Sequence, residues 1–193
     1  MQNNIEVEAE NFDAQSQTEK RKWYLVSKTN KPKVKKDYDK PHLNGASGGK
    51  YLELLPETIY DKKKKVQGTN YSGIAGVMAV VSYNVNFKTP RKYYVWLRGY
   101  STAGGDNSLH VGVNNQWPDS GKQMYICDKS WNKWAWTSYQ FKNSEYCSSS
   151  GSSKRIFIQV QKPGINKVTF SMREDGIEFD KFILTKSETF KPN

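Results

Sequence analysis

The chain has 193 residues, and 30 Lys and Arg against 19 Asp and Glu give it a formal net charge of +11. A chain of this length can bury a hydrophobic core of its own, and an aromatic content of 13% is not typical of a disordered chain. No apolar run approaches the roughly 20 residues of a membrane helix, so we expect no membrane span. Two cysteines are too few for a zinc–thiolate site.

Strand signals dominate the chain, because alternating apolar positions and β-branched or aromatic residues recur between Gly, Asn and Ser turns. About nine such segments predict an all-β protein, a β-sandwich or jelly roll of antiparallel strands, formed by residues 1–193 as a single domain. In chain order the predicted strands are Ile5–Phe12, Tyr51–Leu55, Ile74–Val85, Tyr93–Tyr100, Leu109–Val113, Trp134–Phe141, Arg155–Gln161, Lys167–Arg173 and Ile177–Thr185.

Two long segments, 13–50 and 113–133, carry no clear strand pattern. Loops of this length inside a domain are usually functional or disordered. The first segment is rich in lysine, at positions 31, 33, 35 and 36, and a second lysine run covers 62–65. Such runs fit solvated loops, or an electrostatic surface for a sulfated or acidic polyanion. They lack the arginine and aromatic residues expected of a nucleic-acid groove, so nucleic acid is not favoured as a partner.

The cysteines, Cys127 and Cys147, flank a Trp-rich segment. A disulfide between them would close a loop of about twenty residues. Two buried thiols remain the alternative. The polar and aromatic composition favours the disulfide, and with it a secreted protein.

Acidic residues recur near both ends of the chain. Glu6, Glu8 and Glu10 alternate, so on a strand they share one face, where like charges repel unless a cation lies between them. Carboxylate oxygens suit Ca²⁺, although a solvent-facing edge strand explains the pattern equally well. Asp180 lies in an otherwise apolar predicted strand and could join Glu8 and Glu10 if the first and last strands are neighbours.

Four tryptophans, at 117, 131, 134 and 136, lie within twenty residues in or beside the second long segment. Exposed aromatic faces stack on sugar rings, so we expect Trp117 and Trp134 to line a site and Trp136 to belong to the core. The adjacent carboxylates Glu174 and Asp175 lie in a turn between two predicted strands. They suit accepting hydrogen bonds from sugar hydroxyls, or they form only a charged hairpin turn.

Both ends of the chain resemble carbohydrate-binding modules of families 6 and 35. The resemblance rests on Val7–Phe12 and Arg173–Leu184, together with the stretch from Tyr93 to Arg98 that is followed by Asp106–Ser108. The segment from His110 through Trp117-Pro118 and Cys127 to Trp134-Ala135-Trp136 resembles modules attached to marine polysaccharide-degrading enzymes, agarases in particular.

The resemblance implies a jelly roll with a structural Ca²⁺ held by Glu8, Glu10 and Asp180. It implies a non-catalytic module whose loops bind a polysaccharide through Trp117, Trp134, Glu174 and Asp175, with Arg98 and Asn107 as hydrogen-bond donors. Agarose or a related red-algal galactan is the expected ligand, and the catalytic domain of a secreted bacterial enzyme is the expected partner. The family often has Asn where this chain has Glu174 and Asp175. A small lyase or glycosidase on the same fold is the alternative.

Overall fold

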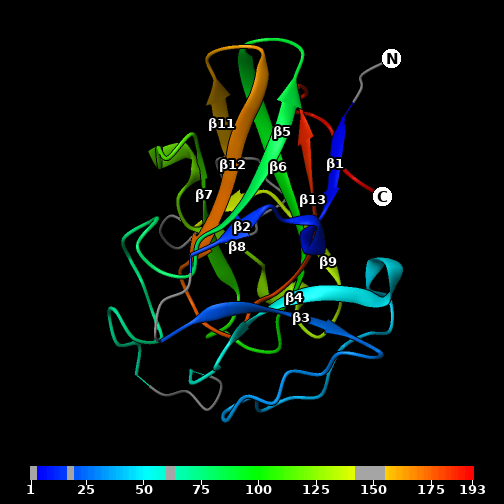
Figure 1. The fold of residues 1–193 in the computed structure, drawn as a ribbon, viewed down its shortest axis with the longest axis vertical. Helices are drawn as coiled ribbons and strands as arrows, with labels where there is room; N and C mark the ends of the chain where they lie inside the picture. Colours follow the sequence, from blue (N-terminus) through cyan, green and yellow to red (C-terminus); the bar gives the residue numbers. More distant parts are fainter. Residues whose placement is uncertain (1–3, 17–19, 60–63, 142–154) are drawn as a thin grey trace.

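The computed structural model describes residues 4–16, 20–59, 64–141 and 155–193, which form two antiparallel sheets packed face to face (Figure 1). These residues contain thirteen strands rather than about nine, and four short 3₁₀ turns. The β-sandwich prediction is therefore confirmed, and the strand count was too low. Among the described residues, no helix has the length and apolar character that crossing a membrane requires.

The first sheet has the order β11-β6-β13-β4-β3, with β1 paired to β13 and β9 paired to β6. Its strands are β1 (Ile5–Glu8), β3 (Lys22–Ser27), β4 (Lys50–Leu55), β6 (Arg91–Tyr100), β9 (Ala135–Thr137), β11 (Phe157–Val160) and β13 (Glu178–Thr185). We call it sheet A.

The second sheet, sheet B, has the order β10-β8-β7-β12-β5-β2. Its strands are β2 (Ala14–Gln15), β5 (Val81–Phe87), β7 (Ser108–Val113), β8 (Met124–Tyr125), β10 (Tyr139–Gln140) and β12 (Gly164–Met172). The strands β5, β12 and β7 lie side by side across one face of the molecule in Figure 1.

Aromatic side chains from both sheets fill the centre of the core. The ring of Phe170 lies 4.8 Å from that of Phe179 and 5.0 Å from that of Phe182, and Tyr83 lies 4.9 Å from Phe182, all measured between ring centroids. All three pairs are edge-to-face or tilted, the arrangements that aromatic quadrupoles favour. The hydroxyl of Tyr83 donates to the carbonyl of Ala9 over 2.8 Å, so its one polar atom is satisfied inside the core.

Two expected strand assignments need correction. The segment 74–80 is irregular rather than part of a strand: Ile74 and Val77 are 60% and 52% exposed, and β5 begins only at Val81. Conversely, β3 lies inside the segment 13–50, which we expected to be a loop. It pairs with β4 along six residues, and Trp23 is buried against Phe179.

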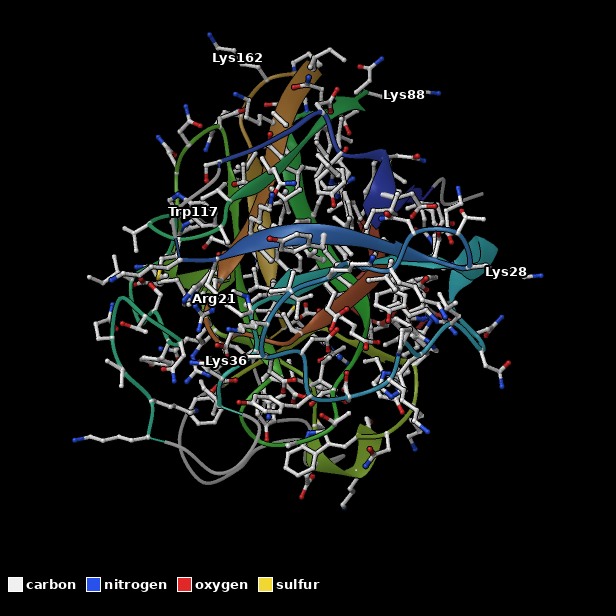
Figure 2. All side chains as sticks on the ribbon, turned by 60° about the horizontal axis from the view of Figure 1, so that its bottom comes forward. Arg21, Lys28, Lys36, Lys88, Trp117 and Lys162 are labelled. Carbon is white, nitrogen blue, oxygen red and sulfur yellow. The ribbon has the colours of Figure 1, made fainter. Side chains whose placement is uncertain are left out.

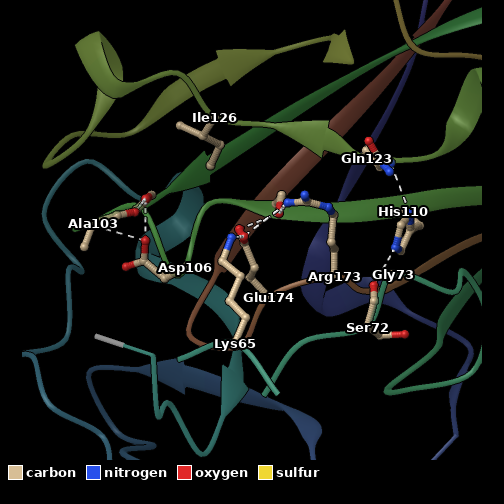
Figure 3. A network of polar contacts seen from close by, with 12 residues as sticks. Lys65, Ser72, Gly73, Ala103, Asp106, His110, Gln123, Ile126, Arg173 and Glu174 are labelled. Atoms are coloured by element: carbon tan, nitrogen blue, oxygen red, sulfur yellow. Dashed lines mark hydrogen bonds and ion pairs between the residues drawn. The ribbon is translucent and has the colours of Figure 1, made fainter. Parts of the chain in front are cut away.

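A buried polar network ties the β12–β13 turn to β7 and to neighbouring loops (Figure 3). Arg173 donates to Ser108 and to Glu174, and Glu174 also accepts from Ser108 and from Lys65. In the same region His110 is fully buried: its Nδ1 accepts from the amide of Gln123 at 3.1 Å, and its Nε2 lies 3.0 Å from the carbonyl oxygen of Ser72.

Candidate functional site

The outer face of sheet A carries a cavity of about 560 Å³. One wall is the sheet itself, where Trp136 of β9 lies directly opposite Arg98 of β6. The other wall is the C-terminal segment, whose Phe190 packs edge-to-face on Trp96. We call this cavity the Trp136 pocket. Its lining residues are Asn4, Glu6, Gly45, Ser47, Arg98, Trp136, Lys181, Ile183, Phe190, Lys191, Pro192 and Asn193.

The pocket combines an aromatic surface with hydrogen-bonding groups of both kinds. Trp136 is half-buried, and its indole N–H donates to the carbonyl of Asn193 at 3.0 Å. Lys181 forms an ion pair with Glu6 at 2.6 Å. Ammonium and guanidinium groups donate hydrogen bonds, whereas carboxylates accept them, so the lining can match hydroxyl groups in either role. Our assignment of Trp136 to the core was therefore wrong.

Arg98 and Trp134, two of the residues that we expected in a binding site, lie together beside this pocket. The guanidinium carbon of Arg98 lies 5.7 Å from the centroid of the Trp134 ring. Arg98 also donates to the carbonyl of Gly45 at 3.0 Å and forms an ion pair with Asp180. The ring of Trp134 is half-buried against Tyr51 and Tyr100, and its N–H donates to the carbonyl of His42.

Trp117 lies elsewhere, against sheet B. A Cβ placed on Gly112 of β7 would come within 2.8 Å of its ring, and a Cβ on Gly76 would overlap its indole nitrogen. The indole thus lies in the space that these two glycines leave open. Figure 2 shows Trp117 on a different side of the molecule from Lys28, which follows β3. Trp117 and Trp134 therefore do not share one site.

The remaining residues of the expected sugar site are inside the protein. Asp175 is fully buried, and its Oδ2 accepts from Arg21 Nη2 at 2.6 Å and from the Thr58 amide at 2.9 Å. Glu174 is 1% exposed within the network of Figure 3. Asn107 is 2% exposed. Side chains this deeply buried have no surface to offer to a polysaccharide, so the site that we propose does not include them.

Glu8 and Asp180, two of the carboxylates expected to hold Ca²⁺, come together near the start of β13. The amide and hydroxyl of Ser47 donate to Asp180 and Glu8 at 2.7 and 3.0 Å, which brings the two acids to one loop. Glu8 Oε2 and Glu10 Oε2 are buried without a hydrogen-bond partner among the described residues, as free ligand oxygens would be. The two glutamates therefore fit a cation, whereas Asp180 already bonds Arg98 and Ser47. The calcium site stays a prediction.

A second acidic cluster, which sequence reasoning missed, lies where the lysine-rich segment meets sheet A. Ligand atoms of Asp39, His42 and Glu178 lie within 4.8 Å of one another, and so do those of Asp37, Asp39 and Glu53. Burial, followed by repulsion from Glu178, raises the pKa of Glu53 to about 10, and burial raises the pKa of Asp39 to about 6. The sequence shows the acidic pair Asp37 and Asp39, but it does not show that they lie near Glu178, because Glu178 is far from them along the chain.

Only one of the two cysteines of the expected disulfide belongs to the described residues. Cys147 is outside the described residues, and Cys127 lies buried before the 3₁₀ turn Asp128–Ser130. The disulfide between them stays a prediction. Residues 62 and 63 of the second lysine run are likewise outside the described part of the chain, whereas Lys65 pairs with Glu174.

Comparison with known proteins gives one relative by sequence and several by structure. No family model matches the chain. An uncharacterized protein of Formosa agariphila is 43% identical over 189 residues, which are 97% of this chain and 45% of that protein, so the chain spans less than half of the relative's length.

The structural neighbours have low sequence identity. A family 35 carbohydrate-binding module from Clostridium thermocellum aligns with 96% of this chain and 99% of its own, with a TM-score of 0.52 at 12% identity. A GH26–CBM35 β-(1,4)-mannanase of Podospora anserina aligns with the whole chain and with 29% of its own, with a TM-score of 0.54 at 11% identity. The chain therefore has the fold of these family 35 carbohydrate-binding modules.

Proposed function

We propose that the chain is a non-catalytic carbohydrate-binding module that binds a polysaccharide, agarose or a related red-algal galactan first, in the Trp136 pocket. The observation that carries this proposal is the pocket itself: about 560 Å³ with one half-buried indole and polar groups around it. Sugar sites need an apolar surface for the C–H face of the ring and convergent polar groups for its hydroxyls. The shared fold with family 35 modules supports the same function.

In this binding mode the ring of Trp136 stacks on one sugar residue. Lys181 and Arg98 donate to ring or glycosidic oxygens, and Glu6 accepts from a hydroxyl group. Trp134 holds Arg98 from the side by a cation–π contact. A calcium ion at Glu8 and Glu10 would fix the first strand beside the last one under the pocket without touching sugar. The module works beside the catalytic domain of a secreted bacterial enzyme.

The test is retention of the chain on insoluble agarose at low and high salt. The decisive variant is Trp136→Ala, and Trp117→Ala is the matched control, because it removes a half-buried indole that packs against the other sheet. We expect the wild-type chain and the Trp117 variant to be retained at both salt concentrations and the Trp136 variant to be lost. Circular dichroism of each variant checks that it is folded.

Three other outcomes would contradict the proposal in different ways. Loss of retention in the Trp117 variant alone would move the site to sheet B. Retention that disappears with salt would identify an electrostatic binder of sulfated or acidic polyanions, since ionic contacts are screened and stacking is not. Release of reducing ends or unsaturated products from agarose or a sulfated galactan would identify an enzyme.

A further inference from the structure

The lysine-rich segment places two aspartates over a pair of facing glutamates on sheet A. Glu53 of β4 and Glu178 of β13 are direct cross-strand partners, so their side chains leave the sheet on the same face. Asp37 and Asp39 come from the segment that follows β3. The carbonyl of Lys36 accepts from the amide of Glu57 at 2.8 Å, which fastens this segment to the loop after β4.

Asp39 links the four carboxylates. It belongs to both groups whose ligand atoms lie within 4.8 Å of one another, one with His42 and Glu178 and one with Asp37 and Glu53. Two ligands of one Ca²⁺ ion, each at 2.3–2.6 Å from it, can be at most about 5 Å apart. Within each group, the spacing of the ligand atoms is thus compatible with a single cation.

Two of these oxygens have no hydrogen-bond partner in the part of the chain that the structure describes. Glu178 is 2% exposed, and its Oε2 has no hydrogen-bond partner among the described residues; the same holds for Oδ1 of Asp37. Directly opposed, buried like charges cost free energy unless a proton or a cation compensates them.

We propose that Asp37, Asp39, Glu53 and Glu178 bind one Ca²⁺ ion, at a site distinct from the carboxylates Glu8, Glu10 and Asp180. The ligands are carboxylate oxygens, which a hard cation with six to eight oxygen ligands prefers, and waters or backbone carbonyls complete the shell. The lysine-rich segment then supplies two of the four carboxylates, and the bound ion holds the segment against sheet A.

His42 orients this site. Its Nδ1 lies 2.7 Å from Glu178 Oε1, and its ring is stacked on Tyr100 at 3.9 Å between centroids. The ring therefore holds one oxygen of Glu178 in place. Carboxylates and histidines that hold a metal ligand in this way are common in the outer shell of metal sites.

The experiment is calorimetric titration of the chelator-treated chain with Ca²⁺, with Mg²⁺ as the competing ion. The variant Asp37→Asn/Asp39→Asn removes two loop ligands without touching the sheet. The matched control, Glu8→Gln/Glu10→Gln, removes two charges from the other acidic site. We expect the Asp37/Asp39 variant to lose one calcium equivalent, or to bind it about tenfold more weakly or worse, while the Glu8/Glu10 control keeps that equivalent.

Terbium gives an independent readout, because Tyr51, Tyr100 and Trp134 surround His42 and can sensitise Tb³⁺ bound nearby. Sensitised emission should persist in the Glu8/Glu10 control and fall in the Asp37/Asp39 variant. Wild-type calcium stoichiometry in the Asp37/Asp39 variant would overturn the proposal. So would a folded wild-type chain whose entire calcium binding disappears in the Glu8/Glu10 control.

Discussion

Acidification should charge His110 only at a large cost to stability. The ring is fully buried in β7, and the amide of Gln123 donates to its Nδ1, so the hydrogen is on Nε2, which donates to the carbonyl of Ser72. A second proton would have to displace the Gln123 amide from Nδ1. Burial lowers the pKa of His110 to about 4, whereas an unfolded histidine titrates near about 6.5.

The sign and size follow from proton linkage. Below pH 6.5 the unfolded chain binds this proton and the folded chain does not, so the stabilisation is complete above about 6.5 and is lost as the pH falls through about 4. A difference of about 2.5 pKa units at about 1.4 kcal/mol each corresponds to about 3 kcal/mol. Carboxylates with raised pKa act in the opposite direction, so the histidine contribution must be isolated by a difference between variants.

The assay uses the fact that the chain has only two histidines, His42 and His110. The imidazole proton resonances are followed during an acid titration, and a His42→Gln variant assigns them. We expect no shift of the His110 resonance between neutral pH and about pH 5. In urea denaturation, the destabilisation caused by His110→Gln should shrink by up to about 3 kcal/mol on acidification. A folded chain in which His110 titrates near 6.5 would refute the reasoning.

Two further predictions concern stability. Asp175→Asn removes the carboxylate partner of the buried Arg21 and should lower the free energy of unfolding by about 3–5 kcal/mol; in urea denaturation, a change below about 1 kcal/mol would show that the pair contributes little. Gly76→Ala should cost about 1–3 kcal/mol more than Gly68→Ala, because both glycines have positive φ but only at Gly76 would a Cβ overlap Trp117. Equal thermal shifts in the two alanine variants would disprove that close packing.

The strands that the sequence predicted best are those with buried aromatic residues. β6 and β13 are buried along most of their length, and both were predicted within two residues of their observed ends. The segment 74–80 is just as apolar, but Ala79 has a φ of 45° and Ile74 is exposed. Composition alone does not reveal that a hydrophobic stretch is folded as an irregular loop.

The candidate site was harder to predict, because its residues meet only through long-range pairing. Sequence proximity suggested that Glu174 and Asp175 act together at the surface, yet each is held inside by a cation, one by its neighbour Arg173 and the other by Arg21 from the opposite end of the chain. The position of Trp136 beside the C-terminal segment likewise depends on a long-range contact, the pairing of β9 with β6. The local sequence pattern predicts which residues are candidates for a site, and the strand pairing determines which other residues they contact.

The pairing of β1 with β13 also determines how the fold responds to tension. Ile5 lies opposite Leu184 and Glu8 lies opposite Lys181, so a force that pulls the two ends of the domain apart is applied at one end of this ladder. Figure 1 shows both termini on that side of the molecule. Such a force breaks the hydrogen bonds between the two strands one after another, starting at the loaded end, instead of shearing them all at once. The carboxylates of Glu8 and Asp180 lie at the opposite end of the ladder from the load. An ion bound between them would resist the separation of the two strands there.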